Sequence, residues 1–406
     1  MKSSSSFLKD GEALRHRVTR DDLKNLPNEK EKLRILTLNT WTDPHLLPER
    51  MEAVCKTIKK EQCDIVVLQE VFSSGAHDTL EKELSAEYHI YRADHRTADL
   101  QVSWWGSLVP AALSFVLSAL ADAAGHGWLA TLFTVLAALL IPWLFIRVVE
   151  ATFLRQLHQK AFGTPARYWD WMALVVLLRK EKFLEGELEV RRPFAKPAYP
   201  YPTSLQGLPF YWFQMSFLRP GFMVLECRGK SQDVTVAACH CVIGDYQNTA
   251  NPGRKIQIEE LLFELNNAAP DGNFAVLAGD FNAGSDQPEL SLLRELGWVD
   301  AVEAHCASHH GGDSTAFRTW EAKNPYTRLT VPTEPDDRID YCFLKLPPAG
   351  SSNQVTIQTA KLIGNKEPFL SDHYGVLVEV EAEVSGGGAL RGGGGGKRAP
   401  SRNKSS

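Results

Sequence analysis

Two polar residues, at positions 280 and 282, follow a stretch with the composition of a buried strand. The apolar run 274–278 leads into Gly279, Asp280, Phe281 and Asn282. Side chains two residues apart on an extended chain point to the same side, which puts a carboxylate beside an amide. Such a pair can hold a metal-bound phosphate or a water molecule. Taken alone, the motif is short, and an ordinary strand exit is the commoner explanation of such a turn.

Other apolar runs lead to, or follow, residues that could do the same chemistry. The alternating stretch 33–39 ends at an asparagine, and the continuous apolar run 64–70 ends at a glutamate. Both patterns predict strands, the second one buried on both faces. The ordered set found in this way is Asn39, Glu70, His240, Asp280, Asn282, Asp340, Asp372 and His373.

This set contains hard oxygen ligands for a magnesium-like ion, two imidazoles, and carboxylates that can orient them. Hydrolysis of a phosphodiester near neutral pH requires a metal to take up charge on the phosphoryl oxygens. It also requires a base to deprotonate water, and assistance to the leaving group. The residue types therefore point to metal-dependent phosphodiester hydrolysis.

The elements that position these residues belong to a long and mainly globular chain. The protein has 406 residues, 44% of them hydrophobic, which is enough for one large or two ordinary domains with a sizeable core. A formal net charge of -5 provides no overall attraction to nucleic acid. Seven cysteines without regular spacing predict reduced thiols and a catalytic body that faces the cytosol. Cys239 and Cys241 are interpreted as packing residues around His240.

Residues 102–121 and 127–149 form two apolar runs, each of about twenty residues. Tryptophans lie toward the ends of these runs, and arginines flank the outer ends. This pattern predicts a transmembrane helical hairpin at 102–149 with both outer ends in the cytosol. The protein would then be an integral membrane protein whose catalytic domain faces the cytosol. A buried helical pair in a soluble domain and an interfacial hairpin are the alternatives.

Three other stretches differ in composition from the predicted body. Residues 1–30 are polar and predict an N-terminal arm, and residues 383–406 are glycine-rich and basic, which predicts a disordered tail. The stretch 193–222 is rich in proline and aromatic residues, and either forms a hairpin in the core or presses on lipid headgroups. His305, Cys306 and His309 are predicted to lie in a solvated loop, because their spacing matches no regular zinc site.

The ordered motifs resemble those of the endonuclease/exonuclease/phosphatase superfamily, the fold of deoxyribonuclease I and of neutral sphingomyelinases. The matching stretches are 38–41, 68–70, His240, 279–282, 338–341 and 371–373. The resemblance covers roughly residues 31–96 and 170–382. It implies an α/β fold in which two packed β-sheets are flanked by helices, a four-layer sandwich interrupted by the hairpin.

The resemblance also implies a role for each site residue. Glu70 would be the principal ligand of Mg²⁺, which Mn²⁺ could replace, with Asn39 beside it and Asp372 next to the metal. Asp280 and Asn282 would hold the water and the phosphate, and Asn39 would contribute to phosphate binding. His373 would be the general base, oriented by Asp340, and His240 would stabilise the transferring phosphoryl group. Asp280 remains a second candidate for the base.

The hairpin and the aromatic stretch favour a membrane lipid as substrate, in the manner of a sphingomyelin phosphodiesterase. An enzyme anchored in a bilayer meets a substrate of that bilayer at a high effective concentration. The hairpin interrupts the catalytic domain rather than following it, which departs from the expected pattern. A nuclease acting on nucleic acid is the main alternative, supported by the basic tail. A catalytically dead, membrane-tethered binding module is the other.

Overall fold

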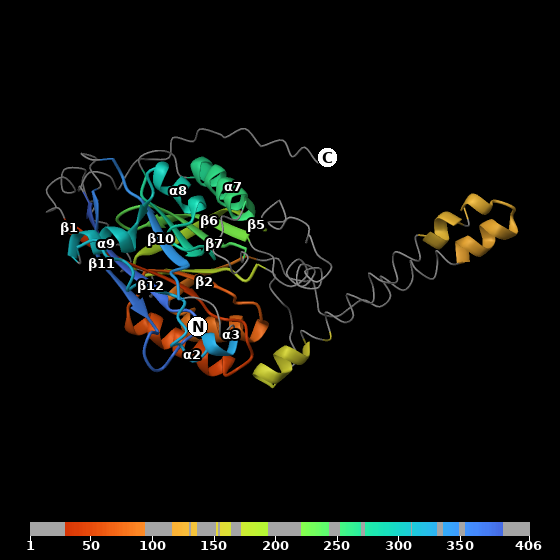
Figure 1. The fold of residues 1–406 in the computed structure, drawn as a ribbon, viewed down its shortest axis with the longest axis horizontal. Helices are drawn as coiled ribbons and strands as arrows, with labels where there is room; N and C mark the ends of the chain where they lie inside the picture. Colours follow the sequence, from red (N-terminus) through yellow and green to blue (C-terminus); the bar gives the residue numbers. More distant parts are fainter. Residues whose placement is uncertain are drawn as a thin grey trace, which may run out of the picture.

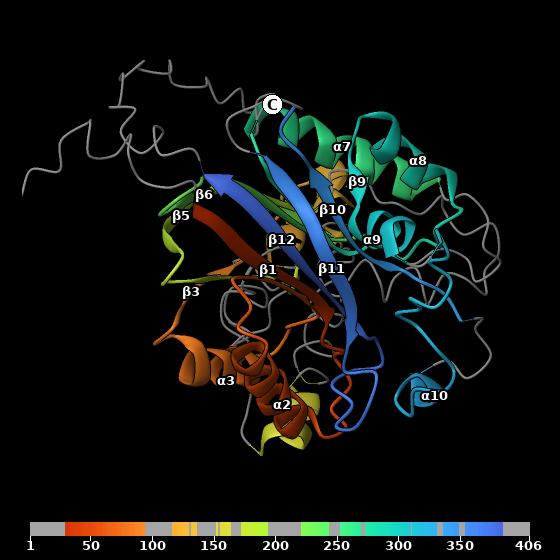
Figure 2. The same cartoon turned by 90° about the vertical axis from the view of Figure 1, so that its left-hand side faces the viewer.

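Two mixed β-sheets pack face to face and carry helices on their outer faces (Figures 1 and 2). This computed structural model describes residues 29–93, 116–129, 131–135, 152, 155–163, 172–193, 221–242, 252–268, 273–309, 311–330, 336–348 and 354–384. The first sheet has the strand order β11-β12-β1-β2-β4-β3, and the second has the order β5-β6-β7-β8-β10-β9. The predicted two-sheet architecture with flanking helices is therefore confirmed.

The strands of the first sheet are β1 (Glu29–Asn39), β2 (Ile65–Gln69), β3 (Tyr88–Arg92), β4 (Val175–Arg179), β11 (Val355–Ile363) and β12 (Gly375–Val384). Those of the second sheet are β5 (Phe183–Pro193), β6 (Gly221–Gly229), β7 (Val234–His240), β8 (Ala275–Asp280), β9 (Val299–Asp300) and β10 (Asp340–Lys345). The helices with defined bounds are α2 (Leu47–Lys60), α3 (Ser74–Leu84), α7 (Pro252–Ala268), α8 (Pro288–Glu295), α9 (Ala301–His309) and α10 (Thr327–Thr330).

Alternation along the strands builds a core on each side of each sheet. Ile35 of β1 faces the second sheet, whereas Leu36 faces α2 and α3. In the same way Val276 of β8 lies between the sheets, and Leu277 packs against α7 and α8. Successive side chains of a strand point to opposite faces, so a continuous apolar run is what a strand buried on both faces requires.

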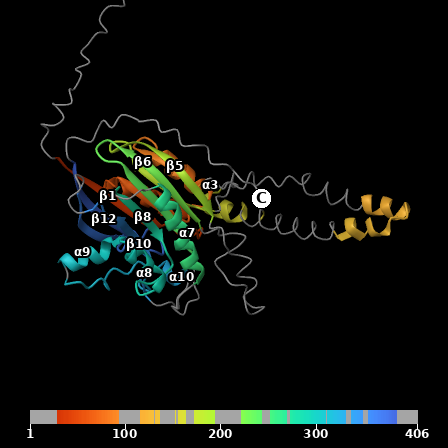
Figure 3. The ribbon, with the colours of Figure 1, turned by 90° about the horizontal axis from the view of Figure 1, so that it is seen from above.

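The β3–β4 connection leaves the first sheet and returns to it. β3 and β4 are antiparallel neighbours, with Arg92 opposite Val175, yet residues 93–174 separate them in the sequence. Of the predicted hairpin at 102–149, residues 102–115 and 136–149 lie outside the described residues. Its central part is helical at 116–123, 127–129 and 131–135, and lies away from the sandwich (Figure 3). Within the described parts of the chain, no helix has the length and apolar character needed to cross a membrane.

One prediction about local structure is wrong, the bounds of two others need a small correction, and several concern residues that the structure does not describe. The prediction of a loop at His305, Cys306 and His309 is wrong, because these residues belong to α9, and the first two are buried. Asp300 begins this helix by accepting hydrogen bonds from the backbone N–H groups of Val302 and Glu303, at 3.0 and 3.2 Å. Residues 1–28 of the predicted arm, 194–220 of the aromatic stretch and 385–406 of the predicted tail lie outside the described residues. The predicted bounds of the arm and of the tail were slightly wrong, because residues 29 and 30 begin β1 and residues 383 and 384 end β12.

Candidate active site

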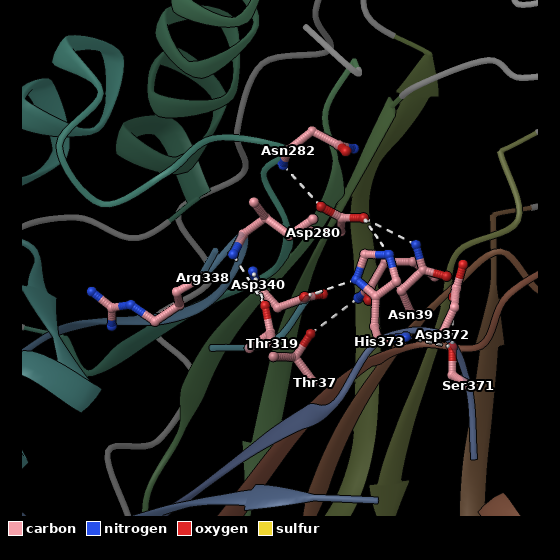
Figure 4. A network of polar contacts seen from close by, with 12 residues as sticks. Thr37, Asn39, Asp280, Asn282, Thr319, Arg338, Asp340, Ser371, Asp372 and His373 are labelled. Carbon is pink, nitrogen blue, oxygen red and sulfur yellow. Dashed lines mark hydrogen bonds and ion pairs between the residues drawn. The ribbon is translucent and has the colours of Figure 1, made fainter. Parts of the chain in front are cut away.

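All eight predicted site residues lie at one edge of the sandwich because of how the strands run. β1 and β2 are parallel, and so are β7 and β8, so the residues at or just after their carboxyl ends emerge together. These are Asn39, Glu70, His240 and Asp280, and Asn282 follows directly. β10 is antiparallel to β8 and starts at that edge, with Asp340 opposite Asp280. β12 is antiparallel to β1, so Asp372 and His373 enter it from the same side (Figure 4).

His373 and Asp340 form a buried hydrogen-bonded pair. His373 Nδ1 lies 2.9 Å from Asp340 Oδ2. Only 5% of His373 and none of Asp340 is exposed to solvent. Thr319 Oγ1 accepts hydrogen bonds from the backbone N–H of Ile339 and of Asp340, at 3.0 and 3.1 Å, which holds the start of β10. The ring of Trp320 contacts the imidazole edge-on, with centroids 4.9 Å apart. The imidazole is therefore fixed with Nδ1 toward Asp340.

Burial and neighbouring carboxylates act on His373 in opposite directions. Burial disfavours the imidazolium, but the negative charges of Asp340, Asp372 and Asp280 outweigh it and hold the pKa of His373 well above its ordinary value. His373 Nε2, the nitrogen away from Asp340, lies 4.0 Å from Asp280 Oδ2. Proton exchange with a substrate or a water molecule would therefore take place at Nε2.

Asp280 lies at the centre of the site and is almost fully buried. Its Oδ1 accepts a hydrogen bond from the backbone N–H of Asn282 at 2.8 Å, and its Oδ2 accepts one from Asn39 Nδ2 at 3.0 Å. His240 Nε2 lies 3.7 Å from the same Oδ2. Burial, followed by the charge of Asp340, raises the pKa of Asp280 above its ordinary value. Asp280 thus connects residues from both sheets (Figure 4).

Asn39 connects Asp280 to Glu70. Its Nδ2 donates to Asp280 Oδ2 and to Glu70 Oε1, both at 3.0 Å, while its Oδ1 accepts from Trp41 N at 3.0 Å. Glu70 Oε2 accepts from the backbone N–H of Thr42 at 2.9 Å. Glu70 has φ 62, a left-handed conformation that few non-glycine residues adopt and that surrounding contacts must maintain.

Asp372 is a second buried carboxylate near Glu70. Ser371 Oγ and Thr330 Oγ1 each donate to its carboxylate at 3.1 Å, and Thr327 Oγ1 donates to its backbone carbonyl at 2.6 Å. Burial raises the pKa of Asp372 to about 7, and the charge of Glu70 contributes to the rise. Asn282 lies on the opposite side of Asp280, where its Nδ2 donates to Cys241 O at 3.0 Å.

The donor atoms present fit a hard divalent cation. Glu70, Asp280, Asp340 and Asp372 provide carboxylate oxygens in one small region, the type of ligand that Mg²⁺ and Mn²⁺ prefer. Asp340 Oδ1 is buried and has no hydrogen-bond partner in the described chain, which is costly unless a positive charge lies nearby. Ligand atoms of Asp280, Asp340 and His373 lie within 4.8 Å of one another, a group that does not include the predicted ligands Glu70 and Asp372. A cation could therefore bind in this region, and its identity stays a prediction.

The structure adds two positioning residues that the sequence patterns did not single out, Arg50 and Arg254. Arg50 of α2 donates to the backbone carbonyls of Thr40, Trp41, Asp43 and His45 at 2.6–3.1 Å, and so holds the loop that follows Asn39. Arg254 of α7 donates to Asn282 O and pairs with the buried Glu289, Nε to Oε1, at 2.7 Å. An arginine on the apolar face of the predicted helix was the only signal available for Arg50.

The sequence matches the endonuclease/exonuclease/phosphatase family over residues 36–373. No curated protein sequence matches the chain. Solved structures with a similar fold include that of Danio rerio TDP2 in complex with a single-strand DNA product. The two sequences are 17% identical, the match covers 86% of this chain and 99% of that chain, and the TM-score is 0.49. Staphylococcus aureus beta toxin is 15% identical, with 85% and 99% covered and a TM-score of 0.49. An endonuclease/exonuclease/phosphatase from Bacteroides vulgatus is also 15% identical, with 87% and 100% covered and a TM-score of 0.48.

Proposed function

Because the chain belongs to the endonuclease/exonuclease/phosphatase family, a family of phosphoesterases, we propose that it is a Mg²⁺-dependent phosphodiester hydrolase. The observation that supports this most directly is the His373–Asp340 pair, whose free nitrogen Nε2 lies 4.0 Å from Asp280. The imidazole of His373 can act as a base, and the carboxylate of Asp280 lies beside it. Phosphodiester hydrolysis requires such a base together with oxygen ligands for a metal.

In the proposed mechanism, His373 takes the proton of the attacking water at Nε2. Its Nδ1–H donates to Asp340, which holds the imidazole in the tautomer that leaves the Nε2 lone pair available. Burial raises the pKa of Asp280, but both of its oxygens already accept hydrogen bonds, from Asn282 N and Asn39 Nδ2, which leaves them less available than His373 Nε2 to take a proton. Asp280 therefore orients the water, with His373 as the acceptor of its proton.

The remaining residues act on the phosphate and on the cation. Glu70, with Asp372 beside it, would hold Mg²⁺, and Asn39 fixes the orientation of Glu70 through its Nδ2. A cation held there would supply charge compensation for the phosphoryl oxygens and for the carboxylates whose charges raise the pKa of His373. His240 faces Asp280 from β7 and would stabilise the negative charge that develops on the phosphoryl group.

For the substrate, we propose a membrane phospholipid of the sphingomyelin type, cleaved by a catalytic domain on the cytosolic side of the membrane. The support comes from the insertion between β3 and β4. Ser118 Oγ and Thr134 Oγ1 lie 2.8 Å apart, so the two helical stretches contact each other as a hairpin. Five large apolar side chains of its described part are about half exposed or more: Val116, Leu120, Trp128, Leu132 and Val135, at 54%, 60%, 70%, 47% and 50%. A hairpin with this surface suits an apolar environment.

A nucleic acid is the second candidate substrate. It is favoured by the basic residues of the tail, where Arg391, Lys397, Arg398, Arg402 and Lys404 follow a glycine-rich stretch. Such a tail attracts phosphate backbones without regard to sequence. It also attracts anionic lipid headgroups, so the tail does not separate the two substrates.

The test is a substrate panel with the full-length, detergent-solubilised chain in Mg²⁺. We expect release of phosphocholine from sphingomyelin or a related choline lipid in mixed micelles, little cleavage of plasmid DNA, and loss of activity with chelator. Glu70→Gln and His373→Ala should each lower the rate at least a hundredfold without loss of folding. Glu185→Gln, at an exposed carboxylate paired with Arg228, is the matched control and should retain lipid activity. DNA cleavage that exceeds lipid cleavage would favour the nuclease, and undiminished activity in excess chelator would refute the metal assignment.

A further inference from the structure

We propose that residues 155–163, which follow the hairpin, are a positioning segment for the metal ligand Glu70, with His158 and Phe162 as its positioning residues. The proposal rests on the proposed function, in which Glu70 holds the cation. The segment is helical from 155 to 162 and belongs to the same insertion as the hairpin. It contacts the start of α3, directly after the turn that carries Glu70.

His158 accepts hydrogen bonds at the first turn of α3. Its side chain is buried, and its Nε2 lies 3.0 Å from the backbone nitrogen of Gly75 and 3.2 Å from Ser74 Oγ. A backbone N–H can only donate, so Nε2 is the acceptor and the neutral tautomer carries its proton on Nδ1. The first N–H groups of a helix have no partner within the helix. Ser73 Oγ satisfies Ala76 N at 3.2 Å, and a residue from the insertion satisfies Gly75 N.

Phe162 fits against the same turn because residue 75 has no side chain. A Cβ atom at Gly75 would lie 2.6–2.8 Å from ring atoms of Phe162, closer than any real contact. The rings of His158 and Phe162 also contact each other, with centroids 4.8 Å apart. The docking therefore uses a polar contact from His158 and an apolar contact from Phe162, and the glycine makes room for the second.

The docked segment and Glu70 line the same cavity. Glu70, Thr42, Ser73 and His158 all line one small cavity, whose other walls are mostly apolar. The turn at 70–73 connects the end of β2 to the start of α3, and Phe72 N donates to Glu70 O at 2.9 Å within it. Since Glu70 has φ 62, its backbone keeps this conformation only while its surroundings hold it. His158 and Phe162 hold the far end of that turn.

The consequence is that the affinity of the site for its cation depends on the seating of the insertion. Residues that orient a metal ligand without touching the metal commonly change metal affinity or activity by 10–100-fold, that is by about one or two orders of magnitude. Here the orienting contact comes from the segment that also carries the hairpin. A hairpin held in a bilayer would keep this segment in place beside the site.

The test measures Mn²⁺ binding to the full-length chain in detergent by electron paramagnetic resonance, without substrate. We expect His158→Ala to raise the dissociation constant for Mn²⁺ about tenfold, and His158→Gln, whose amide oxygen can still accept, to stay within about threefold of the wild type. Gly75→Ala should also weaken binding about tenfold, although alanine favours a helix more than glycine does. His126→Ala, at the exposed turn of the same insertion, is the matched control and should bind as the wild type does.

Hydrogen exchange of the peptide that covers residues 70–76 shows whether docking is lost in each variant. Faster exchange together with weaker Mn²⁺ binding in His158→Ala and Gly75→Ala supports the proposal. Faster exchange with unchanged Mn²⁺ binding would overturn it while leaving the proposed function intact. A wild-type chain that binds no Mn²⁺ would overturn the metal site itself, and this proposal with it.

Discussion

Replacement of Asp340 by asparagine tests the proposed base most directly. The substitution keeps the shape of the side chain but replaces the oxygen that contacts His373 Nδ1 at 2.9 Å. An asparagine would present either an amide nitrogen or a neutral oxygen at this position. An amide nitrogen donates to Nδ1, which moves the imidazole proton to Nε2 and removes the lone pair that would accept the proton of water.

The size of the effect follows from what is lost. A positioned general base contributes about 10²–10⁴ in rate, which corresponds to about 3–5 kcal/mol of transition-state stabilisation. Asp340 is fully buried, so solvent cannot substitute for its carboxylate. The loss should therefore exceed the lower end of this range, at about a thousandfold in kcat, with KM changed less than threefold because the substrate-binding groups remain.

The assay is steady-state hydrolysis of a soluble phosphodiester at saturating Mg²⁺, over pH 5–9. Asp340→Asn should also remove the main charge that raises the pKa of His373, so the acidic limb of the pH profile should shift to lower pH. Asp336→Asn, at a carboxylate in an exposed pair with Arg318, is the control and should behave as the wild type does. A loss of less than tenfold would refute His373 as the base and favour Asp280. The shift of the acidic limb does not by itself separate the two, because the charge of Asp340 also raises the pKa of Asp280.

Three further predictions concern stability and membrane attachment. Burial raises the pKa of Asp372 to about 7, so the metal-free folded protein loses stability as pH rises from about 4 through 7 and this carboxyl group ionises. Asp372→Asn should therefore raise the melting temperature at pH 8 and leave it nearly unchanged at pH 4, as measured by calorimetry in the presence of chelator. Equal shifts at both pH values would contradict this. Gly279→Ala should lower the free energy of unfolding by at least about 3 kcal/mol in urea titrations, because the new Cβ would lie 2.0 Å from Cys239 O in the β7–β8 pair, and a loss under 1 kcal/mol would show that the strands can shift. Leu120→Asp with Trp128→Asp should release the protein from membranes at high pH, where the wild type should sediment with vesicles, and co-sedimentation of the variant would argue against an inserted hairpin.

The sequence by itself determined the strands and the chemistry at their ends. A run such as 64–70 can be buried on both faces only as a strand of a covered sheet, and its last residue then emerges at a sheet edge. That reasoning needs only nearest neighbours, and it singled out the eight candidate site residues, whereas the two-sheet fold was implied by the family resemblance. Their gathering at one edge could be expected from the family resemblance alone, because apolar periodicity does not state which strands are neighbours.

Only the tertiary structure decided how those residues are held. Asn39 meets Asp280 across 241 positions of sequence, and His158 meets Gly75 across 83. Arg50 lies on a helix whose apolar pattern predicts the helix itself but not the four carbonyls that the guanidinium contacts. The physical reason is that periodicity records whether a side chain is buried, while a contact also depends on which distant backbone lies opposite. That choice is made by strand order and packing of the whole chain, so the supports of the site became visible only once both sheets were in place.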